Sequence, residues 1–145
     1  MIPQDFLRLA VQLAASSTEA EWRTAVSRAY YAAFHAARRL LEDLRFTVPR
    51  ADAAHQYLIF RLNNCGEPSI QREAKVLDRL RQLRNRADYD WHLPFTRSHA
   101  QAEPANAQRV IQALDAARQE PVRTRITDAM KVYERDVLKQ VTWHA

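Results

Sequence analysis

An unusually dense set of reactive side chains lies in residues 84–92, which hold two arginines, two carboxylates, a phenol and an imidazole. Arg84 follows Leu77 by seven residues and Leu80 by four, so on a helix it lies beside the apolar stripe rather than opposite it. A guanidinium in that place can hold a phosphate through paired N–H donors. A salt-bridged structural arginine, or a polar helix end, explains the same pattern equally well.

A second group of polar residues recurs at intervals of three or four, which places them on one face of a helix. Its members are Thr24, Arg28, Tyr31, His35 and Arg38. This basic ridge can bind phosphate, and the competing interpretation is an ordinary solvated helix face with buried tyrosine rings.

The elements that position these residues are all predicted to be helical. Thr18 and Glu21 match a capping box, which predicts the start of one long helix over about residues 19–45. Apolar periodicity predicts further helices over about residues 4–15, 52–63, from 69 onwards, within 98–118, and about 121–141. Pro104 must then lie in the first turn of the fifth helix or kink it. We expect an antiparallel helical bundle of about five helices with an extra C-terminal helix.

The amino-acid composition excludes several classes of function. The single glycine, Gly66, excludes phosphate-cradling loops and dinucleotide fingerprints, which need several glycines. The lone Cys65 excludes disulfide frameworks and cysteine-rich zinc sites. The net charge of +5, with arginine supplying 19 of the 22 basic residues, permits an anionic partner such as RNA or a nucleotide. A compositional bias toward arginine explains the same count.

The remaining expectations concern organisation and location. We expect one domain over residues 1–145, because no repeat or long linker interrupts the chain. No uncharged apolar run approaches the ~18 residues of a membrane span, and Asp5 and Arg8 interrupt the first apolar stretch, so we expect no membrane association and a cytoplasmic protein. We expect no metal, because the histidines show no paired ligand spacing. We also expect no cofactor.

Two strings in this order and spacing resemble the HEPN domain. The first is the helix Ser27-Arg28-Ala29-Tyr30-Tyr31-Ala32-Ala33-Phe34-His35, and the second is Arg84-Asn85-Arg86-Ala87-Asp88-Tyr89-Asp90. The resemblance spans about residues 6–117. It implies a helical bundle, a homodimer with a shared cleft, and in many members a metal-independent endoribonuclease. Such members are often toxins paired with a nucleotidyltransferase antitoxin, or parts of phage-defence systems.

The family's active motif is an arginine, often followed by asparagine, and then a histidine a few positions later. Arg84 and Asn85 match its beginning, but Tyr89 stands where the histidine is expected. The Ala-Asp-Tyr form is similar to a sub-branch without that histidine. The first histidine after the motif is His92, whose distance from Arg86 is a spacing the family tolerates.

The residues therefore support two hypotheses. In the first, the protein is a toxin or defence ribonuclease in which Arg84 stabilises the phosphorane, Asn85 orients the substrate, and His92, or less readily Tyr89, moves protons. The RNA or nucleotide would be held by the binding set, Arg28, Tyr31, His35, Arg38, Arg86 and Asp88. In the second, the protein is non-catalytic and binds RNA, a nucleotide or a partner nucleotidyltransferase.

Two further features stay open at the level of sequence. A partner nucleotidyltransferase could modify Tyr89, although a structural tyrosine accounts for it as well. The sixth helix lies beyond the resemblance, and its stripe of Ile126, Met130, Tyr133 and Val137 must pack on the bundle or on another subunit.

Overall fold

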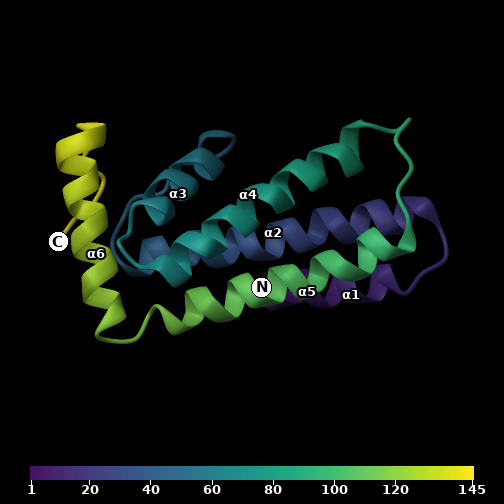
Figure 1. Ribbon diagram of the computed structural model, residues 1–145, viewed down its shortest axis with the longest axis horizontal. Helices are drawn as coiled ribbons and strands as arrows, with labels where there is room; N and C mark the ends of the chain where they lie inside the picture. Colours follow the sequence, from purple (N-terminus) through teal and green to yellow (C-terminus); the bar gives the residue numbers. More distant parts are fainter. The chain divides into compact units, whose positions relative to one another are not determined.

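The computed structural model describes residues 1–145, and its regular structure is helical (Figure 1). The six α-helices are α1 (Pro3–Ala14), α2 (Glu19–Asp43), α3 (Ala53–Asn63), α4 (Pro68–Tyr89), α5 (Arg97–Ala116) and α6 (Val122–Tyr133). A π-helical turn, η1 (Glu134–Leu138), follows α6. The predicted all-α bundle, with a sixth helix after the first five, is confirmed.

Local signals set several of these boundaries. The Thr18 hydroxyl accepts the backbone N–H of Glu21 at 3.3 Å, which is the N-cap bond of the capping box at the start of α2, and it donates to the Glu21 carboxylate at 2.6 Å. Gly66 has a φ of +73°, so it supplies a left-handed residue soon after the end of α3.

The structure excludes one of the two alternatives for Pro104, because α5 already begins at Arg97 and Pro104 lies inside it, well past its first turn. A kink at Pro104 stays a prediction. One predicted boundary is wrong. The last helix ends at Leu138 rather than near residue 141, because Lys139 adopts a left-handed conformation with φ of 54°. Within its predicted apolar stripe, Ile126 and Met130 are buried, but Val137 is 65% exposed.

The chain divides into two compact units. Unit 1 comprises Met1–His35 and Val76–Ile111, and unit 2 comprises Ala36–Lys75 and Gln112–Ala145. Since α2, α4 and α5 each run through a boundary, both units contain part of each of these helices. The single domain over residues 1–145 stays a prediction.

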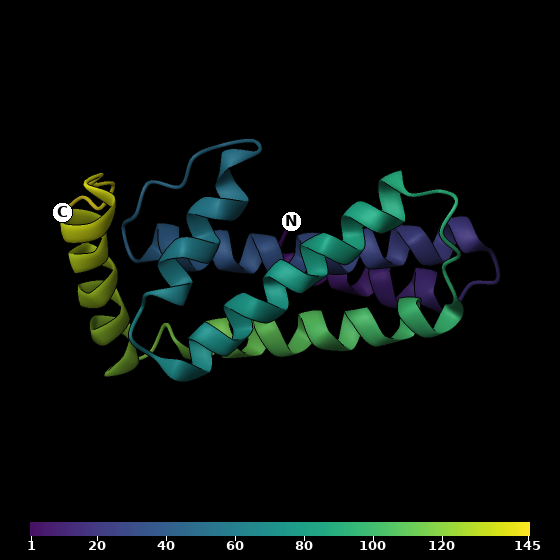
Figure 2. The ribbon, with the colours of Figure 1, turned by 45° about the horizontal axis from the view of Figure 1, so that its top comes forward.

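Unit 1 is built on small side chains, which let its helices approach closely. Ala14 of α1, Ala25 of α2 and Ala100 of α5 form one buried cluster, and Trp22 packs against it. A second cluster joins α2 and α4 to the connection between α4 and α5, through Val26, Ala87 and Phe95. Figure 2 shows this connection leading from the end of α4 to the start of α5. These clusters fix the surface from which the candidate site residues project.

Unit 2 contains a buried ion pair between α3 and η1. Arg61 Nε donates to Glu134 Oε2 at 2.8 Å, and both side chains are almost completely buried. Arg61 Nη2 makes no hydrogen bond, and the guanidinium stacks over the Tyr57 ring with its Cζ atom 3.5 Å from the ring centroid. The ion pair between Arg61 and Glu134 is therefore buried by residues of unit 2.

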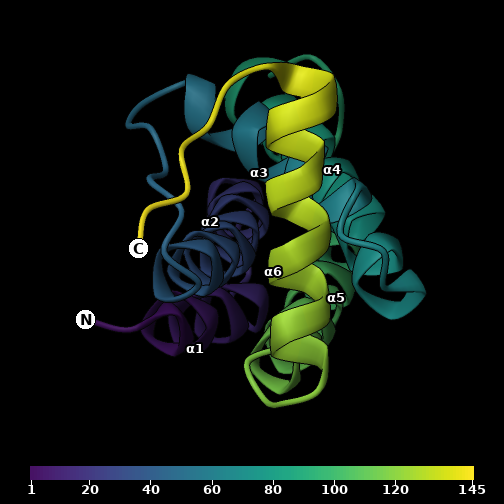
Figure 3. The ribbon, with the colours of Figure 1, turned by 90° about the vertical axis from the view of Figure 1, so that its left-hand side faces the viewer.

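The same ion pair anchors the C-terminal segment, which turns back after η1 (Figure 3). Glu134 accepts the backbone N–H groups of Thr142 at 2.9 Å and Trp143 at 3.1 Å. Trp143 forms an isolated antiparallel bridge with Phe46, and its indole donates to the Leu44 carbonyl at 2.9 Å. Residues beyond the last helix are thus held by one buried carboxylate.

Candidate functional site

Arg84 lies at the centre of a polar cluster in unit 1 that joins α2 to α4. Its Nη2 atom donates to the Tyr31 hydroxyl of α2 at 2.5 Å, and its Nη1 donates to Asn85 Oδ1 at 2.8 Å. Its Nε lies 3.1 Å from Asp88 Oδ2, one helical turn further along α4. The guanidinium is therefore oriented by an amide, a carboxylate and a phenol.

Arg28 extends the cluster along α2. It donates to the Ser27 hydroxyl at 3.3 Å, and that hydroxyl donates in turn to Asp88 Oδ2 at 3.3 Å. The Arg28 guanidinium lies over two aromatic rings, 5.0 Å from the Tyr31 centroid and 5.1 Å from that of Phe6. Stacking of this kind holds a guanidinium in place while leaving its N–H groups available to an anion.

Aromatic rings form one wall of the cluster. The His35 ring stacks on Phe6, with centroids 5.5 Å apart and an interplanar angle of 13°, and its centroid lies 6.2 Å from that of Tyr31. The neighbouring Tyr30 is 4% exposed, and burial raises its pKa above the ordinary value of 10.0. Tyr30 therefore stays protonated and serves as a core residue.

The charge of the cluster favours an anion. It contains the two guanidinium groups of Arg28 and Arg84 but only one carboxylate, that of Asp88. The Arg84 side chain is 19% exposed and that of Asp88 31% exposed, so solvent reaches both groups. A phosphate can approach Arg84 from solvent and compete with Asp88 for its N–H donors.

The structure brings some of the predicted site residues together and leaves others apart. Six of them, Arg28, Tyr31, His35, Arg84, Asn85 and Asp88, form the cluster just described. Tyr89 borders it, with its ring centroid 5.8 Å from the Arg84 Cζ, and its side chain is 71% exposed. The three others, Arg38, Arg86 and His92, have different surroundings.

Arg38 belongs to unit 2, where its guanidinium has structural partners. It pairs with Glu42 at 2.9 Å and donates to the carbonyls of Pro49 at 3.0 Å and Val48 at 3.3 Å. Arg86 is exposed on α4, and His92 is exposed in the connection that follows. A role in binding or catalysis stays a prediction for these three.

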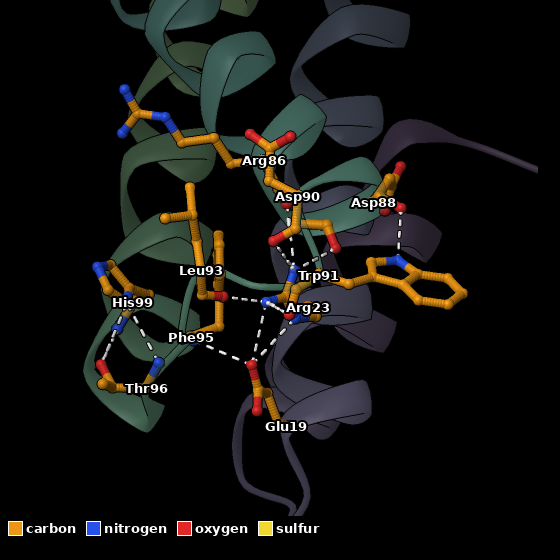
Figure 4. Close-up of polar contacts among 11 residues, drawn as sticks. Glu19, Arg23, Arg86, Asp88, Asp90, Trp91, Leu93, Phe95, Thr96 and His99 are labelled. Carbon is orange, nitrogen blue, oxygen red and sulfur yellow. Dashed lines mark hydrogen bonds and ion pairs between the residues drawn. The ribbon is translucent and has the colours of Figure 1, made fainter.

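Arg23 organises the same region, although sequence reasoning did not select it (Figure 4). Its guanidinium donates to five backbone carbonyls at and beyond the end of α4, those of Arg86, Ala87, Asp90, Trp91 and Leu93. It also pairs with Glu19 at 3.1 Å, and Glu19 accepts the Phe95 N–H at 3.1 Å. That backbone hydrogen bond, together with Arg23, lowers the pKa of Glu19. The four-residue spacing of Glu19 and Arg23 predicts a helical ion pair. No sequence signal predicts that Arg23 also donates to these backbone carbonyls.

A pocket of about 420 Å³ opens beside the end of α4, and Asp88 lines both this pocket and the Arg84 cluster. Its other lining residues are Glu19, Ala20, Arg23, Thr24, Ala87 and Trp91.

No group of three or more His, Cys, Asp or Glu side chains is placed to hold a metal ion. None of the helices has the length and apolar character needed to cross a membrane.

A family profile described as the HEPN domain matches residues 4–118. The match covers more than half of the chain and includes α1 to α5 with every residue of the Arg84 cluster. The chain therefore belongs to the HEPN domain family. No curated protein and no solved structure matches it.

Proposed function

We propose that this HEPN protein binds RNA through a backbone phosphate held by Arg84, with Tyr31 and Arg28 beside it. The observation that carries the proposal is the Arg84 guanidinium, which the Tyr31 hydroxyl holds at 2.5 Å while 19% of the side chain stays open to solvent. A guanidinium whose orientation is already fixed loses little further freedom when it binds a phosphate. The excess of cations over carboxylates in the cluster supports an anionic ligand.

Binding without cleavage is the activity that these groups support best. Metal-free cleavage of RNA needs a group with a pKa near neutrality to move protons while a cation stabilises the phosphorane. The partners of Arg84 are a phenol, an amide and a carboxylate. A free tyrosine has a pKa of ~10, so ionising it at pH 7 costs about 4 kcal/mol.

The test is fluorescence anisotropy with a labelled single-stranded RNA of twelve nucleotides, on wild-type protein and Arg84→Gln. Arg79→Gln is the matched control, because Arg79 is an exposed arginine of the same helix and its loss changes the net charge equally. We expect Arg84→Gln to weaken binding about tenfold, in line with one lost charge-assisted contact, and Arg79→Gln to change it less than twofold. Equal affinities for both variants would remove Arg84 from the binding site.

Metal-independent endoribonuclease activity is the second candidate, and the placement of His35 favours it. Its ring lies 6.2 Å from that of Tyr31, which contacts Arg84. In this mechanism His35 takes the proton of the 2′-hydroxyl as that oxygen attacks the adjacent phosphorus, and Arg84 stabilises the added charge. The bond from phosphorus to the 5′-oxygen then breaks, and the imidazolium returns the proton to the 5′-oxygen. Asn85 would orient the phosphate, and His92 and Tyr89 are the other proton carriers to test.

Incubating RNA with the protein and a chelator decides between the two candidates. Cleavage would give products ending in a 2′,3′-cyclic phosphate, and His35→Ala or Arg84→Gln would abolish it. If His92→Ala alone abolished it, the proton carrier would be His92. Intact RNA after prolonged incubation, with binding retained, supports the binding function.

We further propose the assembly and setting that family membership implies. These are a homodimer, a nucleotidyltransferase antitoxin as partner, a toxin–antitoxin or phage-defence role, and a cytoplasmic location. Light scattering of the purified chain tests the dimer, and the neighbouring gene tests the partner. Co-expression with that partner followed by intact-mass measurement tests modification of Tyr89, since an unchanged mass would reject it.

A further inference from the structure

The connection after α4 has a fixed conformation although it is largely exposed. Arg23, whose side chain is only 11% exposed, donates to the carbonyls of Asp90, Trp91 and Leu93 within it. At the far end of the connection, the centroid of the Phe95 ring lies 4.8 Å from the Cζ atom of the same guanidinium. One largely buried cation therefore holds the backbone of a surface segment.

This rigid segment presents an aromatic side chain that the fold does not use for its core. Trp91 is 80% exposed, and its indole is held by a hydrogen bond to the Asp88 carbonyl at 2.9 Å. Figure 4 shows the indole beside Asp88, pointing away from Leu93 and Phe95. Scattered exposed apolar residues are common, but a large ring on an ordered connection is already oriented for a flat ligand.

The pocket beside Trp91 has walls of two kinds. Ala20 and Ala87 contribute apolar surface, whereas Glu19, Asp88 and Thr24 contribute oxygen atoms, and Arg23 contributes a guanidinium that already pairs with Glu19 and with backbone carbonyls. The two carboxylates repel a phosphate but accept hydrogen bonds from amino groups. An aromatic platform next to carboxylate acceptors matches a nucleobase, since bases stack on aromatic rings and an amino-bearing base can donate to Asp or Glu.

We propose that this pocket receives an unpaired nucleobase bearing an exocyclic amino group, stacked on Trp91 and donating to Asp88 or Thr24. The inference rests on the proposed function, RNA binding at Arg84, and specifies which bases in the RNA are preferred next to that site. Asp88 lines the pocket and also contacts Arg84 at 3.1 Å, so a base in the pocket lies next to the phosphate site. The ligand is then single-stranded RNA that presents adenine, cytosine or guanine, because uracil is the base that carries no exocyclic amino group.

The experiment compares labelled twelve-nucleotide oligomers of A, C and U by anisotropy, with wild-type protein, Trp91→Ala and Trp91→Phe. We expect wild-type protein to bind the A and C oligomers more tightly than the U oligomer. Trp91→Ala should lose about tenfold for the A oligomer, since one base stacked on an aromatic ring contributes roughly that much, and Trp91→Phe should recover part of it. Phe60→Ala, which removes another exposed ring on α3, is the matched control and should bind as wild type does.

The outcomes separate this inference from the proposed function. Equal affinity for all three oligomers, or a Trp91→Ala variant that binds like wild type, would overturn the base pocket while the effect of Arg84→Gln upheld phosphate binding. An unchanged thermal unfolding curve for Trp91→Ala excludes misfolding as the cause of lost affinity. If wild-type protein binds none of the oligomers, the proposed function fails together with the inference.

Discussion

Two clusters of the same chemical groups occur in the two units, and they differ in their exposure. Each contains an arginine, a carboxylate and a tyrosine: Arg84, Asp88 and Tyr31 in unit 1, and Arg61, Glu134 and Tyr57 in unit 2. The side chains of Arg61 and Glu134 are 2% and 0% exposed, whereas those of Arg84 and Asp88 are 19% and 31% exposed. An arginine, a carboxylate and a tyrosine can therefore form a buried structural cluster or a cluster that a ligand can reach from solvent.

Partners explain the difference in exposure. Glu134 is enclosed by backbone N–H groups of the C-terminal segment, which leave no approach from solvent. Asp88 is met only by side chains, those of Arg84 and Ser27, which can rearrange when a ligand arrives. We infer that the Arg61 cluster is structural and that the Arg84 cluster is a binding site, and the following variants test this contrast from the largest expected effect to the smallest.

Glu134→Ala should be the most damaging substitution. Removing one member of a buried ion pair leaves the other charge without a partner, which costs about 3–5 kcal/mol of the free energy of unfolding. Urea denaturation followed by circular dichroism measures this loss. Asp136→Ala, an exposed carboxylate of the same turn, is the control and should change stability by less than about 0.5 kcal/mol. A comparable stability for the two variants would contradict the structural role of Glu134.

Arg23→Ala should release the connection after α4. Its guanidinium makes several charge-assisted hydrogen bonds to carbonyls, and losing them costs about 2 kcal/mol. Hydrogen exchange should accelerate in residues 86–93 and stay unchanged in η1. Arg97→Ala, an exposed arginine at the start of α5, serves as the control. Unaltered exchange in residues 86–93 would show that Arg23 does not hold the connection.

Acid should weaken unit 2 through Glu134. Burial alone raises the pKa of this carboxyl, but hydrogen bonds from Thr142 and Arg61 outweigh burial and lower the pKa below the ordinary value of 4.5. A carboxyl whose pKa is lower in the folded state stabilises the fold above pH 4.5 and loses that contribution as the pH falls through the folded pKa. Wild-type protein should therefore lose more stability than Glu134→Gln between pH 5 and pH 3. Parallel pH profiles for the two proteins would contradict this assignment.

Arg84→Gln should change the free energy of unfolding least. A partly exposed ion pair contributes about 0–1 kcal/mol, so the urea midpoint should stay close to that of wild type. Arg61→Gln makes the same chemical change in the buried cluster and should unfold far more easily. If the two variants were equally destabilised, the distinction between the two clusters would disappear.

The sequence predicts the helices and much of the Arg84 cluster, because both depend on helical spacing. The positions of Arg28, Tyr31 and His35 follow from their intervals on α2, and the place of Arg84 beside the apolar stripe follows from Leu77 and Leu80. The RNA roles of Arg38, Arg86 and His92 have no such support from the structure. The intervals do not reveal that the Val48 and Pro49 carbonyls occupy the Arg38 guanidinium.

Contacts distant in sequence and irregular turns were beyond prediction. Arg61 and Glu134 are 73 residues apart, and their pairing depends on packing rather than on local pattern. Glu134 follows Met130 by four residues and shares its buried face, whereas Val137 lies within the π-helical turn after Tyr133 and points to solvent. The role of Arg23 could not be predicted, because its partners are backbone carbonyls and every residue type carries one.

The salt dependence of RNA affinity tests the central claim most directly. Each phosphate contact made by an arginine adds about 0.9 to the slope of the logarithm of affinity against the logarithm of salt concentration, slightly less for single strands. We therefore predict that Arg84→Gln binds the A oligomer about tenfold more weakly than wild type at low salt, with a slope smaller by about 0.7. Arg79→Gln should keep the wild-type affinity and slope. The same affinity and slope for Arg84→Gln as for Arg79→Gln would contradict a phosphate site at Arg84.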